Sequence, residues 1–291
     1  MIHVIESDCL SVAVSTRGAE LLSVKGKQRG TEFLWQGDAA FWPDRSPVLF
    51  PVVGRLSDDK YRYRGITYGM EIHGFAMKTE FTVIERSGSH IVLRMTHDDT
   101  SLRAYPFEFE FCVKYELTGG NALNEYRVRN AGGDDMYFSI GGHPGFNCPM
   151  RDSARFEDYK FVFNKKESAD LILTNERIYF TEETKPFLRD EDTFGLSYDL
   201  FDGDALVFHN LKSDKIRLAS DLGGPSVEVS FGGFPYLGIW TRRGAPYVCV
   251  EPWHGIGCYE GFDGELPDKQ GIIKLGAGKE FDCAYTISVE E

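Results

Sequence analysis

The chain has 291 residues, of which 42% are apolar and 14% aromatic, a composition that supports a large folded core and excludes a disordered chain. Its 32 basic and 45 acidic side chains give a formal net charge of −13, which repels phosphate backbones and anionic lipid. The longest apolar runs are far shorter than the roughly 18–20 residues that a membrane-spanning helix needs. Neither nucleic acid nor a membrane is therefore expected as a partner.

The cysteines and the first residues indicate the compartment. No Cys-x-x-Cys pair occurs, so neither a zinc ribbon nor a disulfide framework is expected. Segment 1–10 lacks a basic region and carries Glu6 and Asp8 where a signal peptide is apolar. We therefore expect a cytoplasmic protein with reduced thiols, most of them buried. The cysteines are Cys9, Cys112, Cys148, Cys249, Cys258 and Cys283.

The first elements along the chain are a short helix and a hairpin. Segment 38–42 allows a helix of no more than two turns. In residues 107–117 every odd position is apolar and most even positions are charged, which predicts a half-buried β-strand. Turn residues follow at 118–121, and the alternation resumes at Tyr126 and Val128. These segments predict an antiparallel hairpin.

The second half of the chain adds a long polar stretch and two further strands. Residues 164–192 predict an excursion that is either a lid or a solvated loop, and the composition favours the loop. Within it, segment 168–177 allows a second short helix. Alternation over 227–231 and 281–289 predicts two more strands, the latter closing the chain.

Together these patterns predict an all-β fold with few short helices. Thirty-one glycines separate many short alternating runs, which is typical of a sandwich or a barrel and disfavours a parallel α/β fold. The sequence shows no repeat, low-complexity tract or linker. We therefore expect residues 1–291 to form a single domain.

Two basic side chains near the start of the chain are candidates for a site. Arg55 follows an almost wholly apolar run and a glycine, and arginine is rarely buried without a partner. It therefore either ends a strand in water or reaches into a cleft to meet oxygens. His73 precedes Gly74 and is equally open to a structural or a functional role.

His143 lies in a more constrained setting. It follows two glycines and precedes Pro144, which biases it toward extended backbone. The glycines permit close approach of a ligand, and the restricted backbone limits the directions in which the imidazole can point. The alternative is a turn histidine that is hydrogen-bonded to its neighbours.

A third segment supplies a carboxylate and an indole. Glu251 ends a buried-looking strand just before Pro252, where an apolar pocket raises the pKa of a carboxyl group toward the range that a general base needs. Upstream, Trp240 either stacks on a sugar ring or packs in the core.

Other kinds of site find little support. The sequence contains no Gly-rich nucleotide loop and no Gly-x-Ser-x-Gly elbow. His73, His143 and Glu251 have the donor types of a two-histidine, one-carboxylate metal site, but their spacing matches no metal motif. We therefore expect neither a metal nor a cofactor.

Six short segments follow one another along nearly the whole chain. They are Leu49–Arg55, His73–Ala76, Gly141–Asn147, Leu200–Leu206, Phe234–Trp240 and Cys249–Gly255. Each is weak alone, but in this order they resemble the aldose 1-epimerases, or galactose mutarotases, and within these the LacX-like bacterial subgroup. The resemblance implies a large antiparallel β-sandwich whose concave face holds a sugar.

The resemblance also implies roles for the candidate residues. His143 matches the family's general acid and Glu251 its general base. His73 and Arg55 match residues that orient the sugar, as does Asp204, although the neighbouring Asp202 fits that position if the register shifts. Trp240 is the candidate for stacking on the sugar.

The implied reaction is the interconversion of the α and β anomers of an aldose. A base removes the C1 hydroxyl proton while an acid protonates the ring oxygen, and the two exchange roles when the ring closes. Each role contributes roughly 10²- to 10⁴-fold, and no cofactor is needed. We expect a bell-shaped pH profile whose acidic limb reports Glu251 and whose basic limb reports His143.

Two alternatives remain beside an isomerase of free aldoses. One is an epimerase that acts on a modified sugar such as a hexose phosphate, and the other is a sugar-binding protein without activity. A phosphate favours extra arginines near the cleft, and Arg242 and Arg243 are the obvious pair. Their place before Gly244 favours a solvated turn instead. These motifs specify neither the sugar nor the oligomeric state.

Overall fold

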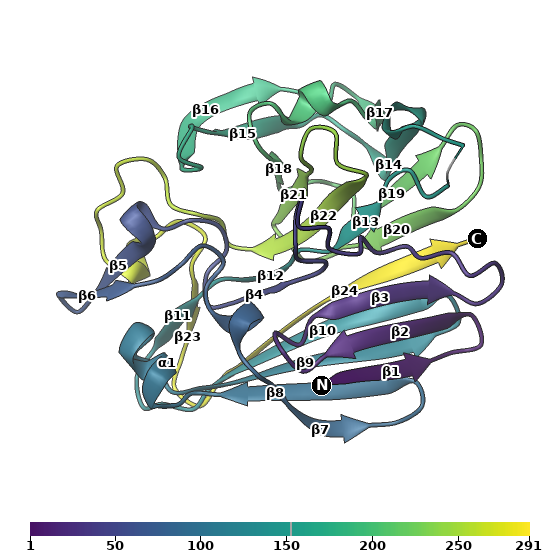
Figure 1. The fold of residues 1–291 in the computed structure, drawn as a ribbon. Helices are drawn as coiled ribbons and strands as arrows, with labels where there is room; N and C mark the ends of the chain where they lie inside the picture. Colours follow the sequence, from purple (N-terminus) through teal and green to yellow (C-terminus); the bar gives the residue numbers. More distant parts are fainter. Residues whose placement is uncertain (152) are drawn as a thin grey trace.

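The computed structural model describes residues 1–151 and 153–291, and its architecture is two large antiparallel sheets with smaller ones around them (Figure 1). Every pairing between the named strands is antiparallel. The prediction of an all-β fold is therefore confirmed. No helix among the described residues has the length and apolar character needed to cross a bilayer.

The larger sheet has nine strands. In spatial order they are β17 (Glu191–Gly195), β14 (Tyr159–Glu167), β19 (Lys215–Ser220), β20 (Ser226–Ser230), β24 (Glu280–Glu290), β10 (Asn121–Asn130), β9 (Phe109–Thr118), β8 (His90–Thr96) and β7 (Thr82–Arg86). The predicted hairpin is the β9–β10 pair, in which Thr118 lies opposite Asn121, and the two later predicted strands are β20 and β24. Strict alternation of apolar and polar residues is what made these strands visible in the sequence.

The second large sheet has eight strands and carries the site. In spatial order they are β16 (Phe180–Pro186), β15 (Asp170–Thr174), β18 (Leu206–His209), β21 (Tyr236–Trp240), β22 (Tyr247–His254), β12 (Ile140–Gly142) and β4 (Val48–Leu49), with β13 (Gly145–Asn147) also paired to β22. Strand β22 is buried along nearly its whole length. It therefore lacks the polar alternation of a half-exposed strand.

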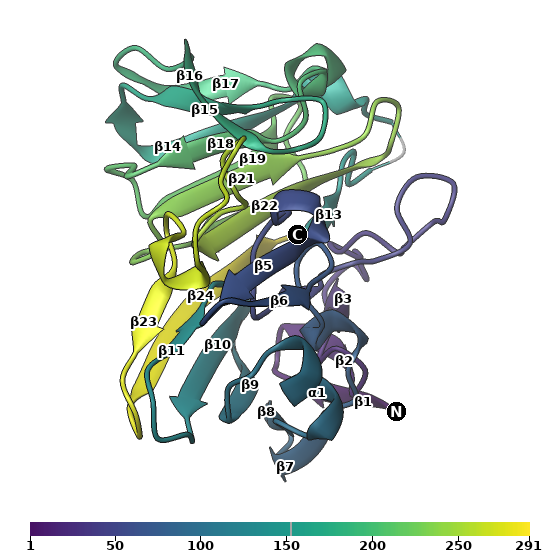
Figure 2. The same cartoon turned by 90° about the vertical axis from the view of Figure 1, so that its left-hand side faces the viewer.

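Three smaller sheets complete the fold. They are β1 (Ile2–Glu6), β2 (Leu10–Ser15) and β3 (Leu21–Gly26); β5 (Lys60–Tyr63) and β6 (Ile66–Gly69); and β11 (Met136–Phe138) with β23 (Ile273–Leu275). The first of these lies over β8, β9 and β10, as both views show (Figures 1 and 2). The Tyr115 hydroxyl joins the layers by donating to the Ala19 carbonyl at 2.6 Å.

Within residues 1–151 and 153–291, helix is confined to one short α-helix and five short 3₁₀ turns. The helix α1 spans Asp99–Ala104 and begins with a capping box, in which the Asp98 side chain accepts from the Thr100 and Ser101 amides. The 3₁₀ turns are Ser57–Asp59, Ala76–Lys78, Phe156–Asp158, Tyr198–Phe201 and Leu266–Asp268. Both helices predicted from the sequence are wrong, because segment 38–42 is a turn and segment 168–177 holds β15.

The long excursion predicted over residues 164–192 is also wrong as a solvated loop. It consists of the end of β14, the hairpin β15–β16 and the start of β17 (Figure 2). The three successive apolar residues 171–173 show no period of two, so the strand could not be told from a helix by its pattern.

The core lies between the layers and is rich in aromatic side chains. Residues from β9, β10 and β24 pack in it with the even-numbered Val248 and Val250 of β22. All six cysteines are free thiols, and three of them are buried, namely Cys148, Cys249 and Cys258.

Candidate active site

A cavity of about 420 Å³ adjoins the eight-stranded sheet. Strand alternation explains its floor, because successive side chains of a strand point to opposite faces. In β22, Val248 and Val250 enter the main core, whereas Glu251 and Trp253 line the cavity. In β21, Trp240 lines it likewise while Ile239 faces the core.

His143 is held against this floor by close backbone packing. It directly follows β12, and its amide donates to the Pro47 carbonyl at 3.1 Å. A Cβ on Gly142 would lie 2.6 Å from the Tyr285 ring, and one on Gly141 would lie 2.7 Å from Trp253. The glycines therefore admit side chains of the protein, not a ligand as the sequence predicted.

An indole further fixes the His143 ring. Trp42 stacks on the imidazole with ring centroids 4.8 Å apart and an interplanar angle of 31°. Trp42 is itself nearly buried and lines the cavity. Sequence reasoning missed this residue, because it lies in a turn with no motif around it.

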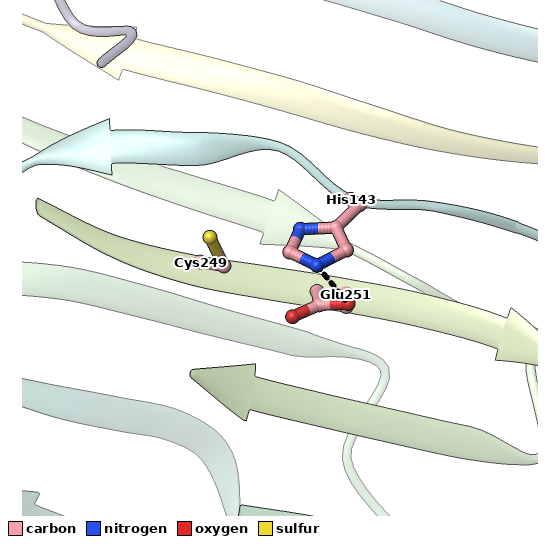
Figure 3. Close-up of side chains that lie close together, drawn as sticks. All are labelled: His143, Cys249 and Glu251. Atoms are coloured by element: carbon pink, nitrogen blue, oxygen red, sulfur yellow. Dashed lines mark ion pairs between the residues drawn. The ribbon is translucent and has the colours of Figure 1, made fainter. Parts of the chain in front are cut away.

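The central feature is the contact between His143 and Glu251. The Nε2 atom of His143 lies 3.2 Å from Oε2 of Glu251, and both side chains are buried (Figure 3). Burial raises the pKa of Glu251 well above its usual range, and the Asp204 carboxylate raises it further, while the Trp253 indole opposes the rise. Burial, together with His73, lowers the pKa of His143 well below its usual range.

These opposite pKa directions favour a pair that holds one proton in total and carries no net charge. Adding a second proton puts a net positive charge into the buried site, and removing the only proton leaves a net negative one. The arrangement can therefore take a proton from a bound molecule at one residue and give a proton at the other without changing its own net charge.

His73 lies beside this pair. Its ring centroid is 5.5 Å from that of His143, and the two rings are nearly perpendicular. The Gly54 amide donates to Nδ1 of His73 at 3.2 Å, which leaves the proton on Nε2. Burial lowers the pKa of His73 to about 4, so the ring is a neutral hydrogen-bond donor near pH 7.

The sequence offered Asp204 and Asp202 as alternatives for one position in the site, and the two residues have different surroundings in the structure. Asp204 lines the cavity, whereas Asp202 forms an exposed ion pair with Arg243 at 2.6 Å. Burial raises the pKa of Asp204, and a hydrogen bond from the Trp240 indole acts against this rise. Asp204 also has a φ of +84°, an uncommon conformation for a residue other than glycine.

The half-buried side chain of Trp240 forms part of the cavity wall. It contacts the His143 ring edge-on at 5.8 Å, and the Arg242 guanidinium lies over its ring at 5.8 Å. Arg242 lines the cavity, while Arg243 points its charge to Asp199 and Asp202. Both arginines are exposed at the turn before Ala245, as the sequence predicted, although Arg242 also borders the cavity.

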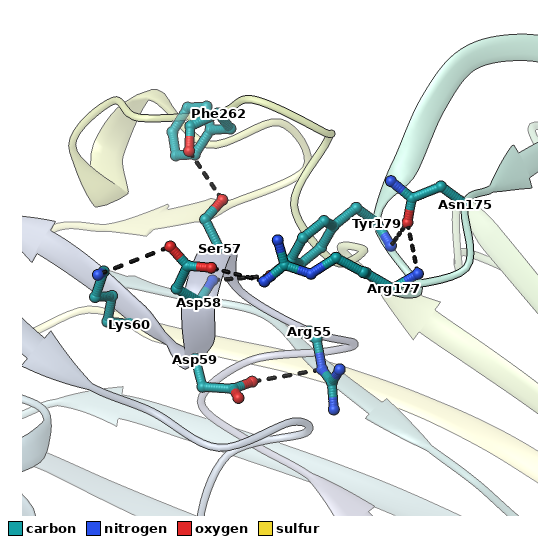
Figure 4. A network of polar contacts seen from close by, with 9 residues as sticks. All are labelled: Arg55, Ser57, Asp58, Asp59, Lys60, Asn175, Arg177, Tyr179 and Phe262. Carbon is teal, nitrogen blue, oxygen red and sulfur yellow. Dashed lines mark hydrogen bonds and ion pairs between the residues drawn. The ribbon is translucent and has the colours of Figure 1, made fainter.

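Arg55 is not brought to this cavity. Its Nε lies 3.4 Å from Oδ1 of Asp59, and Figure 4 shows the two side chains facing each other. The neighbouring Gly54 lines the cavity instead. A role of Arg55 toward the sugar stays a prediction that requires the side chain to leave Asp59.

The tip of the β15–β16 hairpin forms a further wall that the sequence did not indicate. Thr174, Ile178 and Phe180 line the cavity from this tip. Ile178 has a φ of +65°, which is a strained conformation for a β-branched residue. No sequence signal marks this residue, because the strain arises only from the folded turn.

Polar contacts tie the same tip to the turn before β5 (Figure 4). The Arg177 guanidinium pairs with Asp58 at 2.7 Å, and the Asp58 amide donates to the Tyr179 hydroxyl at 2.9 Å. Within the tip, the Asn175 side chain accepts from the Arg177 amide at 2.9 Å. The tip of the hairpin is thus fastened to the turn Ser57–Asp59.

Cys249 is a second residue that sequence reasoning passed over. Its sulfur lies with the ligand atoms of His143 and Glu251 in a cluster whose members are all within 4.8 Å of one another (Figure 3). The sequence offered two histidines with Glu251 as a donor set and predicted no metal site; among the described residues the donors that cluster are His143, Cys249 and Glu251. The spacing of two residues between Cys249 and Glu251 on one strand was the available signal.

Comparison with known proteins places this site in context. The family model described as aldose 1-epimerase matches residues 1–266. Two LacX proteins of Lactococcus lactis subsp. lactis, one plasmid-borne and one chromosomal, are each 32% identical over 280 residues, covering 93% of this chain and 93% of theirs.

Solved structures show the same similarity. A galactose mutarotase related enzyme from Lactobacillus acidophilus is 33% identical with a TM-score of 0.95, covering 100% of this chain and 98% of that one. A galactose mutarotase-like protein from Lactobacillus casei is 29% identical with a TM-score of 0.94, and both chains are covered completely.

Proposed function

The chain belongs to the aldose 1-epimerase family, and we propose that it interconverts the α and β anomers of an aldose by acid–base catalysis at His143 and Glu251. The observation that carries the proposal is the buried 3.2 Å contact between these two side chains on the cavity floor. A single proton between two groups suits a reaction that takes one proton from the substrate and returns one to it.

Ring opening uses the form of the pair in which His143 holds the proton. Glu251 takes the proton of the C1 hydroxyl while His143 gives its own to the ring oxygen, and the C1–O5 bond breaks to leave the aldehyde. The pair then has its proton on Glu251. After rotation about C1–C2, Glu251 returns its proton to the aldehyde oxygen as O5 attacks C1, and His143 takes the proton from O5.

The surrounding residues orient the sugar. The Nε2–H of His73 donates to a sugar oxygen, and the Asp204 carboxylate accepts from a hydroxyl. The Trp240 face covers one side of the ring. These contacts fix the sugar relative to the pair but transfer no proton themselves.

The test is the decay of a pure anomer, followed by polarimetry or NMR. We expect His143→Asn and Glu251→Gln each to lower kcat by at least roughly 10²-fold while circular dichroism stays unchanged. His254→Asn is a matched control, because His254 ends the same strand as Glu251 but does not line the cavity. Near-normal rates in either catalytic variant would refute the assignment.

A sugar with an anionic substituent is the second candidate, and Arg242 is the observation that favours it. Arg242 lines the cavity and has no ion pair among the described residues, unlike Arg243. Four carboxyl groups also line the cavity, which opposes an anion and makes a free aldose the first candidate. The lining carboxyl groups belong to Asp44, Glu71, Asp204 and Glu251.

Substrate comparison separates the two candidates. If the substrate is a sugar phosphate, Arg242→Ala lowers kcat/KM for the phosphate and leaves the free sugar unaffected. Arg243→Ala is the control, because this side chain is held outside the cavity by its two carboxylates. Equal effects of Arg242→Ala on both substrates would contradict this second function.

A further inference from the structure

The proton-transfer pair has a third potential ligand beside it. Cys249 precedes Glu251 by two residues on β22, so both side chains leave the same face of the strand. His143 comes from the segment after β12, and Figure 3 shows it facing Glu251 with Cys249 to one side of the pair. Their ligand atoms all lie within 4.8 Å of one another, and all three residues are buried.

This donor set is suited to a borderline-soft divalent cation. Thiolate, imidazole and carboxylate are the three ligand types that Zn²⁺ uses in proteins. Zinc–ligand distances of about 2.0–2.3 Å in a tetrahedral site put neighbouring ligand atoms roughly 3.3–3.8 Å apart. The 3.2 Å between His143 and Glu251 is already close to this value. The thiol sulfur, which lies within 4.8 Å of the other ligand atoms, therefore needs to approach them by about 1.5 Å at most.

A second observation points to a cation at this place. Oε2 of Glu251 is buried and accepts no hydrogen bond from the described residues, although it faces the imidazole. A buried carboxylate oxygen that accepts no hydrogen bond gains strongly from a positive charge, because the surrounding dielectric is low. His143 and Glu251 also line the cavity, which supplies an entry route and a free fourth position for water.

We propose that His143, Cys249 and Glu251 form an inhibitory site for Zn²⁺ and similar borderline-soft divalent cations. Coordination displaces two protons to solvent, one from the thiol and one from the His143–Glu251 pair, and so occupies both groups of the proton-transfer pair. The inhibition rests on the proposed function, because it assumes that this pair is catalytic. Metal binding itself rests on the geometry alone.

Cobalt provides a direct probe of binding, since Co²⁺ bound by a thiolate gives a charge-transfer absorption band. We would titrate Co²⁺ into the metal-free full-length protein at one fixed pH, and then displace it with Zn²⁺. The matched variants are Cys249→Ala and Cys148→Ala, because Cys148 is equally buried but lies outside the cluster. The band is expected in the wild type and in Cys148→Ala, and is expected to be lost in Cys249→Ala.

Mutarotation rates supply the second readout. Zn²⁺ is expected to inhibit the wild type competitively with the sugar. Cys249→Ala should keep a basal rate close to that of the wild type, while its inhibition constant for Zn²⁺ rises by roughly tenfold or more, as expected for loss of a coordinating group.

The outcomes separate the metal site from the proposed function. A thiolate band in a protein that turns over no sugar supports the metal site and refutes the function. Absence of the band in the folded wild type, or its persistence in Cys249→Ala, overturns the metal site whatever the activity. If Cys249→Ala does not fold, Cys249→Ser serves instead, and the same thiolate band must be absent from it.

Discussion

Adding one methyl group behind His143 tests whether the tight packing of β12 sets the catalytic geometry. In Gly142→Ala, the new Cβ would lie 2.6 Å from Cε1 of Tyr285 and 2.7 Å from its hydroxyl oxygen. Ordinary contacts of this kind are 3.4–4 Å, so β12 and the Tyr285 ring must separate by most of an ångström. Tyr285 is buried and hydrogen-bonded with Tyr126, which limits how far the ring retreats.

The magnitudes follow from that overlap. Overpacking of a core by one methyl group costs about 1–3 kcal/mol. For a chain of this size, each kcal/mol lowers Tm by about 2–4 °C. Because His143 is the next residue, a displacement near 1 Å should also lower kcat by up to about 10²-fold.

Thermal unfolding and the decay of a pure anomer measure the two effects. Gly195→Ala is the control, since a Cβ there meets nothing within 4 Å and the backbone is not left-handed. Gly142→Ala combined with Tyr285→Leu should lose less stability than the sum of the two single variants, because the second change removes the ring edge that the new Cβ meets. Wild-type stability and rate in Gly142→Ala alone would refute the reasoning.

Three further predictions concern pH, metal and the hairpin tip. The pH profile should be bell-shaped, but the pKa directions assign its acidic limb to the second protonation at His143 and its basic limb to proton loss from Glu251, the reverse of the expectation from sequence. A rate that changes in one direction only across the measured pH range would contradict this assignment. Dialysis against a chelator should leave the rate undiminished, and a loss restored by one divalent ion would show metal dependence. Arg177→Ala should raise KM, because loss of the pair with Asp58 loosens the hairpin tip that lines the cavity. Arg189→Ala is the control and should leave KM unchanged, because it breaks a similar 2.7 Å pair with Asp170 away from the cavity. Equal KM values in the two variants would count against a role for the tip.

A strand of this fold can be predicted from the sequence when one of its faces is exposed to solvent. Strands β9, β10 and β24 alternate, because one face packs in the core and the other meets water. Strand β15 was mistaken for a helix, because its consecutive apolar residues 171–173 have no period. The helix α1 was overlooked, although Asp98 and Ser101 give it a capping-box signal.

Some residues of the candidate site could be named from the sequence, and others could not. His143, His73, Glu251, Asp204 and Trp240 were all named from the sequence and all line one cavity. Arg55 does not, because the carboxylate of Asp59 lies within its reach four residues along the chain. Cys249, Trp42 and Ile178 were missed. Trp42 and Ile178 reach the site through turn geometry that no local pattern encodes, whereas Cys249 had a local signal in its two-residue spacing from Glu251 on one strand.

The position of Glu251 explains how a strongly acidic protein keeps the His143–Glu251 pair neutral. Strand β22 is covered on both faces, so the carboxyl group lies among aromatic and apolar side chains, and its carboxylate neighbour Asp204 also opposes ionisation. The one basic group in contact is His143, which the same burial keeps from holding a full charge alone. When the proton moves from Glu251 to His143, the pair becomes an ion pair whose opposite charges lie 3.2 Å apart. A sugar that bridges the two side chains supplies the hydrogen-bond donors and acceptors that this ion pair lacks in the empty site. Substrate binding should therefore favour the reactive arrangement of the proton, so the empty site avoids the cost of maintaining a buried ion pair.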